Sequence, residues 1–384
     1  MNRKLQNKWL TLSFVIALAG FFIKYFNYHI SYIILDVSLV FFLLITYNNH
    51  ISAFKRIDGW LLGSFVVFNI YIILRFLFNH EGYTMMQCIL NPYFIPATLV
   101  TFLIFTDITK EQILSLIKKT PFVVILSVLF AFYRPVSAFF LLEMVLPFYI
   151  IYLFQSRKFK KNLLLIAYSI GAMYWYVIVA ENRGVLFLLI FFIGGCFVSE
   201  YFTRLKKITY NLYLAFFFLF PILLFGYNIS LLDTSTYNFQ SANKDFYKDT
   251  RTFLYYETVN TLMDDDAMLF GLGLNGRIKT DLQDFVDQSV DSQGRRSFVE
   301  SGILEYMKRG GLVYMLLYIF ILLIPAKRLI ESDDKFHNLI GFYILASLIT
   351  SLIGITPRIT LQYISLMLLC SMGYNNSIIR KDVK

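Results

Sequence analysis

Charged side chains are scarce in this chain of 384 residues: 16% of them are Asp, Glu, Lys or Arg, whereas 58% are hydrophobic. Soluble globular domains carry about a quarter charged residues, so the composition excludes an ordinary soluble protein and indicates an integral membrane protein. The formal net charge of +10 is then explained by loop lysines and arginines that face an anionic leaflet. We therefore expect no nucleic-acid partner.

Cysteine and histidine are also few. The three cysteines, Cys88, Cys196 and Cys370, are too widely spaced to predict a disulfide framework or a metal site. None of the four histidines has a partner at catalytic spacing, so no Ser/His/Asp or Cys/His set can be built. The three aspartates at 264–266 contain a D-x-D pattern that could hold a divalent cation, but they also suit a solvated helix end. We expect neither a metal nor a cofactor.

Long apolar runs fill most of the chain. A helix needs about 20 apolar residues to cross the hydrocarbon core of a bilayer. Twelve candidate spans follow, of which the fourth and fifth are short: 9–23, 30–46, 60–78, 92–105, 121–132, 136–154, 163–180, 184–201, 210–232, 311–329, 339–355 and 359–374. The first resembles a signal peptide, but the next apolar run follows almost at once, which favours an uncleaved span. The predicted fold class is an all-α integral membrane protein with about 12 transmembrane helices.

Basic residues set the predicted topology. Lysine and arginine concentrate in both terminal tails and in alternate connections between the spans. The positive-inside rule then requires twelve spans, with both termini in the cytoplasm. We divide the chain into spans one to nine (1–232), a large extracytoplasmic loop (233–310), and spans ten to twelve with a cytoplasmic tail (311–384).

The large loop shows helical periodicity, so we expect a small, partly helical cap rather than a structureless connection. Apolar residues recur at helical spacing in two sets: Ile278, Leu282 and Phe285, and then Val299, Ile303, Tyr306 and Met307.

Ionisable residues inside or beside apolar spans are costly and are candidates for function. Seven of them are expected on the extracytoplasmic side: Asp36, Arg75, Arg134, Glu143, Glu181, Arg183 and Arg358. Together they predict a polar cavity that opens to that side. Single arginines at span ends also serve as anchors at the headgroups, and this explanation stays open for each residue taken alone.

Two arginines are expected at helix starts. The segment DTRTFLYYETVNTL (249–262) predicts a helix with Arg251 in its first turn, and Arg183 directly precedes a span that begins at Gly184. A cation in this position opposes the helix dipole, so the placement favours a bound anion held by the free N–H groups and the guanidinium together. A pyrophosphate group would suit both. Alternatively, the helices begin earlier, or Glu181 neutralises Arg183.

The motif GLGLNG at 271–276 matches the dinucleotide pattern G-x-G-x-x-G, but no apolar strand precedes it. We expect a tight turn, or a backbone surface near a ligand.

The segment SFVESGILEYMKRGGLV (297–313) allows two roles for one carboxylate. Ser297 and Glu300 have the spacing of a capping box, which predicts a structural role for Glu300. Glu300 also shares a helical face with Leu304 and Met307, and this face leads into span ten. The second interpretation holds Glu300 at the mouth of the membrane as a catalytic or binding carboxylate.

With these features, the chain resembles the superfamily of O-antigen polymerases and O-antigen ligases. The resemblance covers the dozen spans and the large loop before the last three. It also covers NRG at 182–184, the stretch from Arg251 to the GLGLNG turn, and ESGILEYMKRGG at 300–311. Ligases usually show His-Asn where this chain has Glu300 and Ser301, so the polymerase branch is favoured.

The resemblance implies a GT-C-like membrane glycosyltransferase of the cytoplasmic (inner) membrane. Such an enzyme joins repeat units linked to undecaprenyl diphosphate into an O-antigen or capsule at the outer face. The implied partners are this lipid-linked oligosaccharide, membrane lipid and a chain-length regulator protein. The implied catalytic residues are Glu300, Arg183 and Arg251. Glu300 is the first candidate for the general base, and Glu181 and Glu143 are the alternatives. The implied substrate-binding residues are Arg358, Arg134, Glu181, Glu143 and Arg277. The alternatives are a flippase for the same lipid-linked unit, a ligase-type transferase and, least favoured, a membrane acyltransferase.

Overall fold

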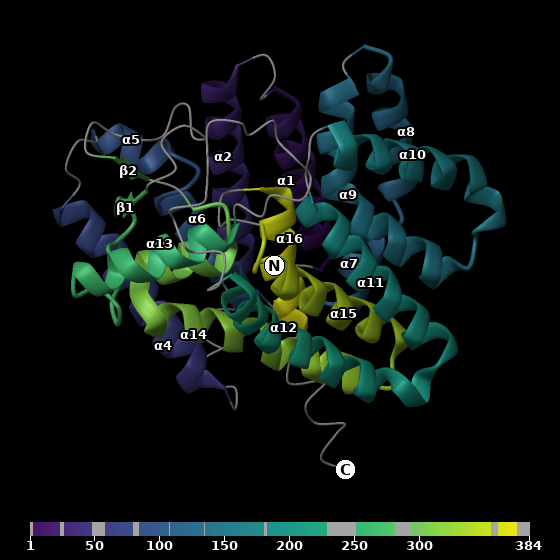
Figure 1. Ribbon diagram of the computed structural model, residues 1–384. Coiled ribbons are helices and arrows are strands. Elements are labelled where there is room, and N and C mark those ends of the chain that lie inside the picture. The colour runs from purple at the N-terminus through teal and green to yellow at the C-terminus, as the bar shows by residue number, and fades with distance from the viewer. Residues whose placement is uncertain are drawn as a thin grey trace.

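The computed structural model describes residues 3–23, 27–47, 58–79, 84–106, 108–133, 135–179, 183–228, 251–280, 294–297, 299–354 and 360–374. Helices dominate these residues (Figure 1). The first half of the chain forms α1 (Arg3–Ile23), α2 (Tyr28–Tyr47), α4 (Gly59–Phe78), α5 (Met85–Leu90), α6 (Ile95–Val100), the 3-10 helix η1 (Thr101–Phe105), α7 (Lys110–Ile117), α8 (Thr120–Ala131), α9 (Pro135–Ser156), the 3-10 helix η2 (Lys160–Asn162) and α10 (Leu163–Val179).

The second half adds the elements that bear the candidate site. They are α11 (Arg183–Tyr201), the 3-10 helix η3 (Thr203–Leu205), α12 (Lys206–Asn228), α13 (Arg251–Asp264), β1 (Ile278–Lys279), β2 (Arg295–Arg296), α14 (Gly302–Glu331), α15 (Lys335–Thr350) and α16 (Leu361–Gly373). Short polar side chains cap several helices: Asp334 accepts from the N–H of Phe336 at the start of α15, and Thr360 accepts from the N–H of Tyr363 at the start of α16.

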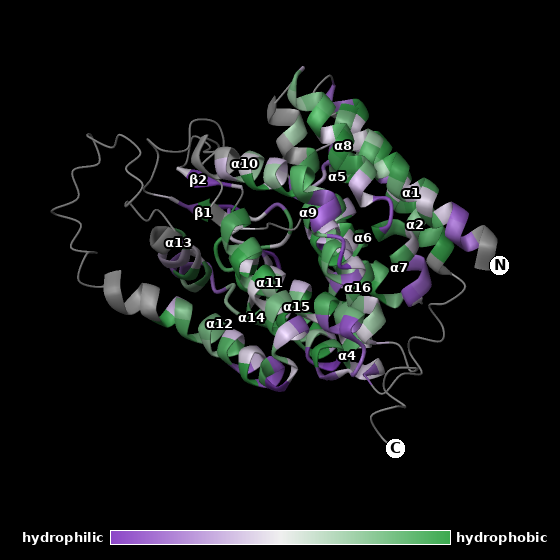
Figure 2. Ribbon diagram, turned by 90° about the vertical axis from the view of Figure 1, so that its right-hand side faces the viewer, coloured by the Kyte–Doolittle hydropathy of each residue, from purple (hydrophilic) through white to green (hydrophobic). Residues whose placement is uncertain are grey.

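The chain is a membrane protein built mainly from helices. Within the described residues, six helical segments are long and apolar enough to cross a bilayer: Gln6–Ile23, Gly59–Phe78, Met85–Phe105, Lys110–Ala131, Gly184–Tyr201 and Gly302–Glu331. Figure 2 shows the hydrophobic colouring that runs along most of the helices. Each of the twelve predicted spans overlaps helical residues. The count of twelve membrane crossings and the GT-C-like arrangement stay predictions.

The helices α15 and α16 form the centre of the bundle. Every side chain of α15 from Asn338 to Thr350 is buried, and α15 packs against α11, α14, α9 and α12. The outer helices instead expose large apolar side chains: Val67 on α4 is 67% exposed, Phe122 on α8 is 63% exposed and Leu164 on α10 is 86% exposed. Such surfaces suit contact with lipid rather than water.

Residues 251–280, 294–297, 299 and 300 form a small cap on the bundle, made of α13, a two-stranded ribbon of β1 and β2, and the turns around them. In Figure 1 these elements lie together on one flank, next to α14. The sequence placed Ile278 on one helical face with Leu282 and Phe285. For Ile278 this prediction is wrong, because Ile278 pairs with Arg296 in the ribbon, and Leu282 and Phe285 lie outside the described residues. The Ile278 side chain is buried against Leu254, Val299 and Leu304. The apolar residue at this position is therefore the buried residue of a strand rather than of a helix.

A glycine pair breaks α14 where it enters the bundle. Gly310 and Gly311 leave the helical conformation, and Gly311 has a φ of 68°, in the left-handed region. The predicted domain boundary after residue 310 falls at this break. The carbonyl groups of Lys308 and Arg309 consequently lose their partners in the helix, and buried carbonyls need new ones.

The GLGLNG turn supplies those partners. The N–H of Leu272 donates to the carbonyl of Lys308 at 2.7 Å, and the N–H of Gly273 donates to that of Arg309 at 3.1 Å. The exchange is mutual, since the N–H of Leu312 donates to the carbonyl of Met268 at 2.8 Å. The prediction of a tight turn is confirmed, and its glycines allow two backbones to touch.

Candidate functional site

Two helices that begin at predicted site residues, α11 and α13, and the start of α14, which closely follows Glu300, come together at the turn directly after α15. At the start of α14, the N–H of Gly302 donates to the carbonyl of Gly354 at 3.0 Å. The Cα of Gly184, on the first turn of α11, lies 3.7 Å from where a Cβ on Gly354 would be. Tyr255, just over one turn into α13, donates its hydroxyl to the carbonyl of Leu352 at 2.7 Å. The starts of α11, α13 and α14 are therefore neighbours.

Arg183 is the first residue of α11 and Arg251 is the first residue of α13, where the sequence predicts helix starts. The fold brings these two backbone positions to the same end of the bundle. Both side chains lie outside the described part of the structure, as do Arg134, Glu181 and Arg358. Arg358 belongs to the segment that leads from Gly354 to α16, so its position in the chain follows directly on the shared turn.

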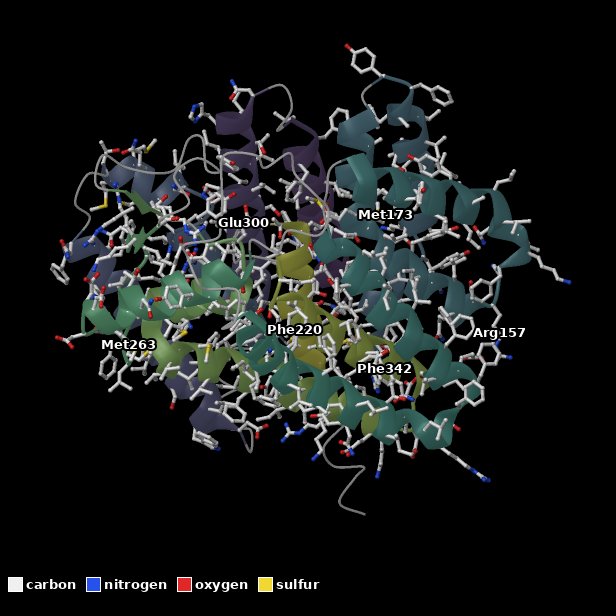
Figure 3. All side chains as sticks on the ribbon, viewed as in Figure 1. Arg157, Met173, Phe220, Met263, Glu300 and Phe342 are labelled. Atoms are coloured by element: carbon white, nitrogen blue, oxygen red, sulfur yellow. The ribbon has the colours of Figure 1, made fainter. Side chains whose placement is uncertain are left out.

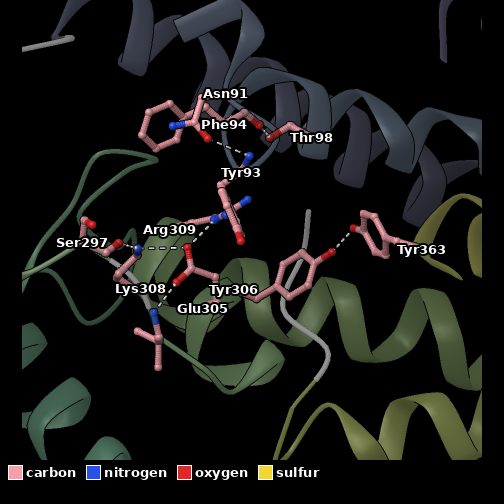
Figure 4. A network of polar contacts seen from close by, with 11 residues as sticks. Asn91, Tyr93, Phe94, Thr98, Ser297, Glu305, Tyr306, Lys308, Arg309 and Tyr363 are labelled. Carbon is pink, nitrogen blue, oxygen red and sulfur yellow. Dashed lines mark hydrogen bonds and ion pairs between the residues drawn. The ribbon is translucent and has the colours of Figure 1, made fainter. Parts of the chain in front are cut away.

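A group of five buried ionisable side chains lies where the cap meets α14. We call it the cap cluster: Glu257, Arg296, Glu305, Lys308 and Arg309, each no more than 7% exposed. On α14, Glu305 receives Lys308 Nζ at 2.9 Å and Arg309 Nε at 2.7 Å on one carboxylate oxygen. The other oxygen accepts the N–H of Val299 at 3.1 Å (Figure 4). The Glu305 carboxylate is buried, and both of its oxygens already accept hydrogen bonds from these partners.

The second pair of the cap cluster joins the ribbon to α13. Arg296 donates to Glu257 at 2.6 Å, and the hydroxyl of Thr280 donates to the other oxygen of Glu257 at 2.9 Å. Arg296 Nε is buried and has no hydrogen-bond partner among the described residues. Burial lowers the pKa of Arg296 from its ordinary value, while the charges of Glu257, Glu300 and Glu305 act in the opposite direction.

The cap cluster has a surplus of positive charge. Its three cations face two carboxylates inside the cluster, with Glu300 at its edge, and within the described part of the chain one buried N–H donor is unused. The Arg296 guanidinium is paired with Glu257, but a buried N–H donor without an acceptor costs free energy, so this position favours a negatively charged ligand that could accept from it. The cluster adjoins the meeting point of the helices, because Glu305 lies one turn after Gly302, whose N–H donates to the carbonyl of Gly354.

Glu300 lies at the edge of the cap cluster, before the start of α14. The predicted capping box is wrong: α14 begins at Gly302, its N-cap is Ser301, and the Ser301 hydroxyl accepts from the N–H of Leu304. The shift occurs because Val299 packs in the apolar cluster of the cap, which keeps residues 299 and 300 outside the helix. The Glu300 side chain is exposed and accepts none of the hydrogen bonds found among the described residues.

The other predicted residues within the described part of the chain lie at different places relative to the cap cluster. Glu143 is half-buried on α9, a helix that packs against α8, α10, α11 and α15 rather than the cap. Arg277 is half-buried at the start of the ribbon, next to the glycine turn. Arg75, at the end of α4, donates to the carbonyls of Phe270 and Gly271 at 3.2 and 3.0 Å. Arg75 therefore anchors the glycine turn to the bundle.

The aspartates at 264–266 end α13. Asp264 pairs with Lys279 at 2.8 Å, and Asp265 lies 3.8 Å from Arg295. These contacts tie the end of α13 to the ribbon.

Buried tyrosines continue from the cap cluster into the bundle. Tyr306 stacks on Tyr318 with ring centroids 3.7 Å apart, and its hydroxyl bonds to that of Tyr363. Tyr314 donates to Asn69 at 2.7 Å. In Figure 4, Arg309 and Tyr306 project from the same part of α14, and the Arg309 guanidinium points toward Tyr93. Buried, hydrogen-bonded tyrosines therefore adjoin the cap cluster on the side that faces the bundle.

The sequence analysis missed the cap cluster. A signal for part of it was present, because Glu305, Lys308 and Arg309 have the i, i+3 and i, i+4 spacing of a helical charge set directly before a glycine pair. No local signal joins them to Arg296 and Glu257, which reach the cluster through the ribbon and α13.

No protein-family model matches this chain, and neither a curated protein nor a solved structure matches it. The resemblance to the O-antigen polymerases and ligases therefore rests on the motifs of this chain alone.

Proposed function

We propose that the chain is a membrane glycosyltransferase that joins lipid-linked oligosaccharide repeat units into a surface polysaccharide. The growing glycan would move from its polyprenyl diphosphate to a hydroxyl group of the next lipid-linked unit, at the outer face of the cytoplasmic membrane. The observation that carries the proposal is the surplus of buried positive charge in the cap cluster, beside the starts of α11, α13 and α14.

The proposed reaction breaks the bond between the anomeric carbon and the phosphate oxygen. The bonding electron pair leaves with the lipid diphosphate, so negative charge grows on a group that needs no general acid. Fixed cations in a water-poor site stabilise such charge because they need no reorganisation during the reaction. In this proposal Arg183 and Arg251 bind the diphosphate, and the unused Nε–H of Arg296 donates a further hydrogen bond to it.

The acceptor hydroxyl must lose a proton as its oxygen bonds to the anomeric carbon, and a carboxylate can take it. Glu257 and Glu305 are both held by cations and by further hydrogen-bond donors, which makes them poor bases. Glu300 is exposed at the edge of the same cluster and carries no such commitment within the described residues. We assign the role of general base to Glu300.

The first experiment removes each arginine in a strain that lacks the wild-type gene. Arg183→Ala and Arg251→Ala should each abolish polymer on a gel, while an immunoblot shows normal protein levels. Arg157→Ala is the matched control, because Arg157 lies at the edge of the molecule, far from Glu300 (Figure 3), and its side chain is 71% exposed. Full-length polymer from both site variants at normal protein levels would contradict the proposal.

Two carboxylate variants separate chemistry from structure. Glu300→Gln should lose activity by a factor of about 10²–10⁴ and keep its protein level, since the side chain is exposed. Glu305→Gln should lower the protein level itself, because it weakens a buried ion pair. A purified enzyme supplied with the lipid-linked unit should lengthen it without added metal. Accumulation of unpolymerised units on the inner leaflet of the null strain would instead favour a flippase.

A further inference from the structure

A large apolar groove lies between helices that do not carry the cap cluster. Its volume is about 680 Å³, in the range of about 300–1,000 Å³ that is usual for small-molecule sites. It is formed by α1, α8 and α9, with contributions from the end of α7 and the first residue of α16. The walls are almost wholly apolar and include Phe14, Leu18, Phe22, Val123, Leu126 and Phe130.

One end of the groove is cationic. Lys118 and Lys119, between α7 and α8, both line it and both are exposed. The amine of Lys119 donates to the Thr11 hydroxyl at 3.4 Å, and neither lysine takes part in an ion pair among the described residues. Two adjacent cations without a carboxylate partner therefore stand at the mouth of an apolar cavity.

The groove is open on the lateral surface of the bundle, between α1 and α8. Val15 on α1 and Phe122 on α8 both line it, and their side chains are 54% and 63% exposed. Its lysine end adjoins α7, whose first residue, Lys110, pairs with Asp334 just beyond the end of α14 that is distant from the cap. The cationic end thus lies on the side of the bundle away from the cap.

We propose that this groove binds one anionic phospholipid of the leaflet opposite the cap. Its acyl chain would fill the apolar part, and its phosphate would lie between Lys118 and Lys119. Charge complementarity decides the occupant. A second copy of this chain would offer an apolar helix face and leave both lysines without a counter-charge, whereas an anionic lipid supplies a hydrocarbon chain and a negative headgroup in the right order. The inference does not depend on the proposed glycosyltransferase activity.

The experiment titrates the purified protein in detergent with phosphatidylglycerol or phosphatidylcholine and counts retained lipid by native mass spectrometry. We expect one phosphatidylglycerol per chain, retained at least about tenfold more strongly than phosphatidylcholine. The double variant Lys118→Ala/Lys119→Ala should lose this preference. The control Lys160→Ala/Lys161→Ala removes the same charge from an exposed pair outside the groove and should retain the lipid like the wild type.

A second pair of variants tests the apolar part. Ala19 is exposed on α1 and lines the groove, so Ala19→Trp should fill it and reduce retention of both lipids about tenfold without disturbing the core. Val67→Trp adds the same bulk to an exposed position on α4, outside the groove, and should have no effect. Equal retention of both lipids by the wild type would overturn the proposal, as would unchanged binding by either groove variant. Recovery of a lipid-free dimer would assign the groove to a second copy instead.

Discussion

The ion pairs at the two ends of the bundle differ in how deeply their side chains are buried. At the cap, Glu305, Lys308 and Arg309 pair with side chains that are no more than 3% exposed. At the far end, Lys110 and Asp334 are 33% and 31% exposed, and Arg157 beside Glu200 is 71% exposed. Exposed pairs gain little because water and salt screen them. Burying a charged pair removes both charges from water at a high cost in free energy. The stability of the fold therefore depends more on the pairing within the cap cluster than on the exposed pairs of the opposite end.

The largest difference should appear when one partner is removed at each end. Glu305→Ala leaves two buried cations without their carboxylate, and we expect a loss of about 3–5 kcal/mol in the free energy of unfolding. Glu200→Ala, at the far end, should cost less than about 1 kcal/mol, because its partner Arg157 is largely exposed. Denaturant titration in mixed micelles measures both. Equal losses would show that the two ends do not differ in this way.

The glycine contact at the cap offers the next largest effect. A Cβ on Gly311 would lie 2.2 Å from the carbonyl carbon of Leu269, and the φ of this residue is positive. Gly311→Ala should therefore cost about 1–3 kcal/mol and release the glycine turn from α14.

The matched control for Gly311 is Gly63→Ala on α4. Apart from the backbone of its own helix, no heavy atom of the described residues lies within 4 Å of the added Cβ, so this change should stabilise the helix by about 0.5–1 kcal/mol. Thermal unfolding of the two variants against the wild type makes the comparison. A stable Gly311→Ala protein whose turn resists proteolysis would contradict the role of the glycine pair in docking the cap.

The sequence predicted the helices well because their signal is local. Long apolar runs mark α1, α4 and α11 without reference to the rest of the chain. The GLGLNG turn was also predicted, since closely spaced glycines favour a turn with positive φ, and Gly271 and Gly273 adopt it.

The site was predicted less well, because it depends on contacts between distant segments. Glu300 is displaced from the expected helix by the packing of Val299 against Leu254 and Ile278, which lie in other parts of the cap. Glu305 looks like an ordinary surface charge on a helix until the cap covers it. Pairing between α13, the ribbon and α14 has no local sequence signal, so neither the burial of the cluster nor its surplus charge could be predicted.

The smallest effect should be a pH dependence at the far end. Burial acts to raise the pKa of Asp334, but hydrogen bonds from Lys110 and from the N–H of Phe336, with the charge of His337, outweigh it and hold the pKa below its usual value. A carboxyl group with a lowered pKa stabilises the fold above its unfolded pKa of about 3.9, and this contribution is lost as the pH falls through the folded value.

Asp334→Asn should remove that dependence. Its cost above about pH 5 should stay below about 1 kcal/mol, since the pair is about one-third exposed, and it should shrink further at high salt. Unfolding of the wild type and the variant between about pH 5 and pH 2 measures the difference, which should close at the acidic end. The loss from Glu305→Ala should persist at high salt, because buried charges are poorly screened. An Asp334→Asn cost that salt leaves unchanged would mean that the far end is as well shielded as the cap, and the contrast between the two ends would fail.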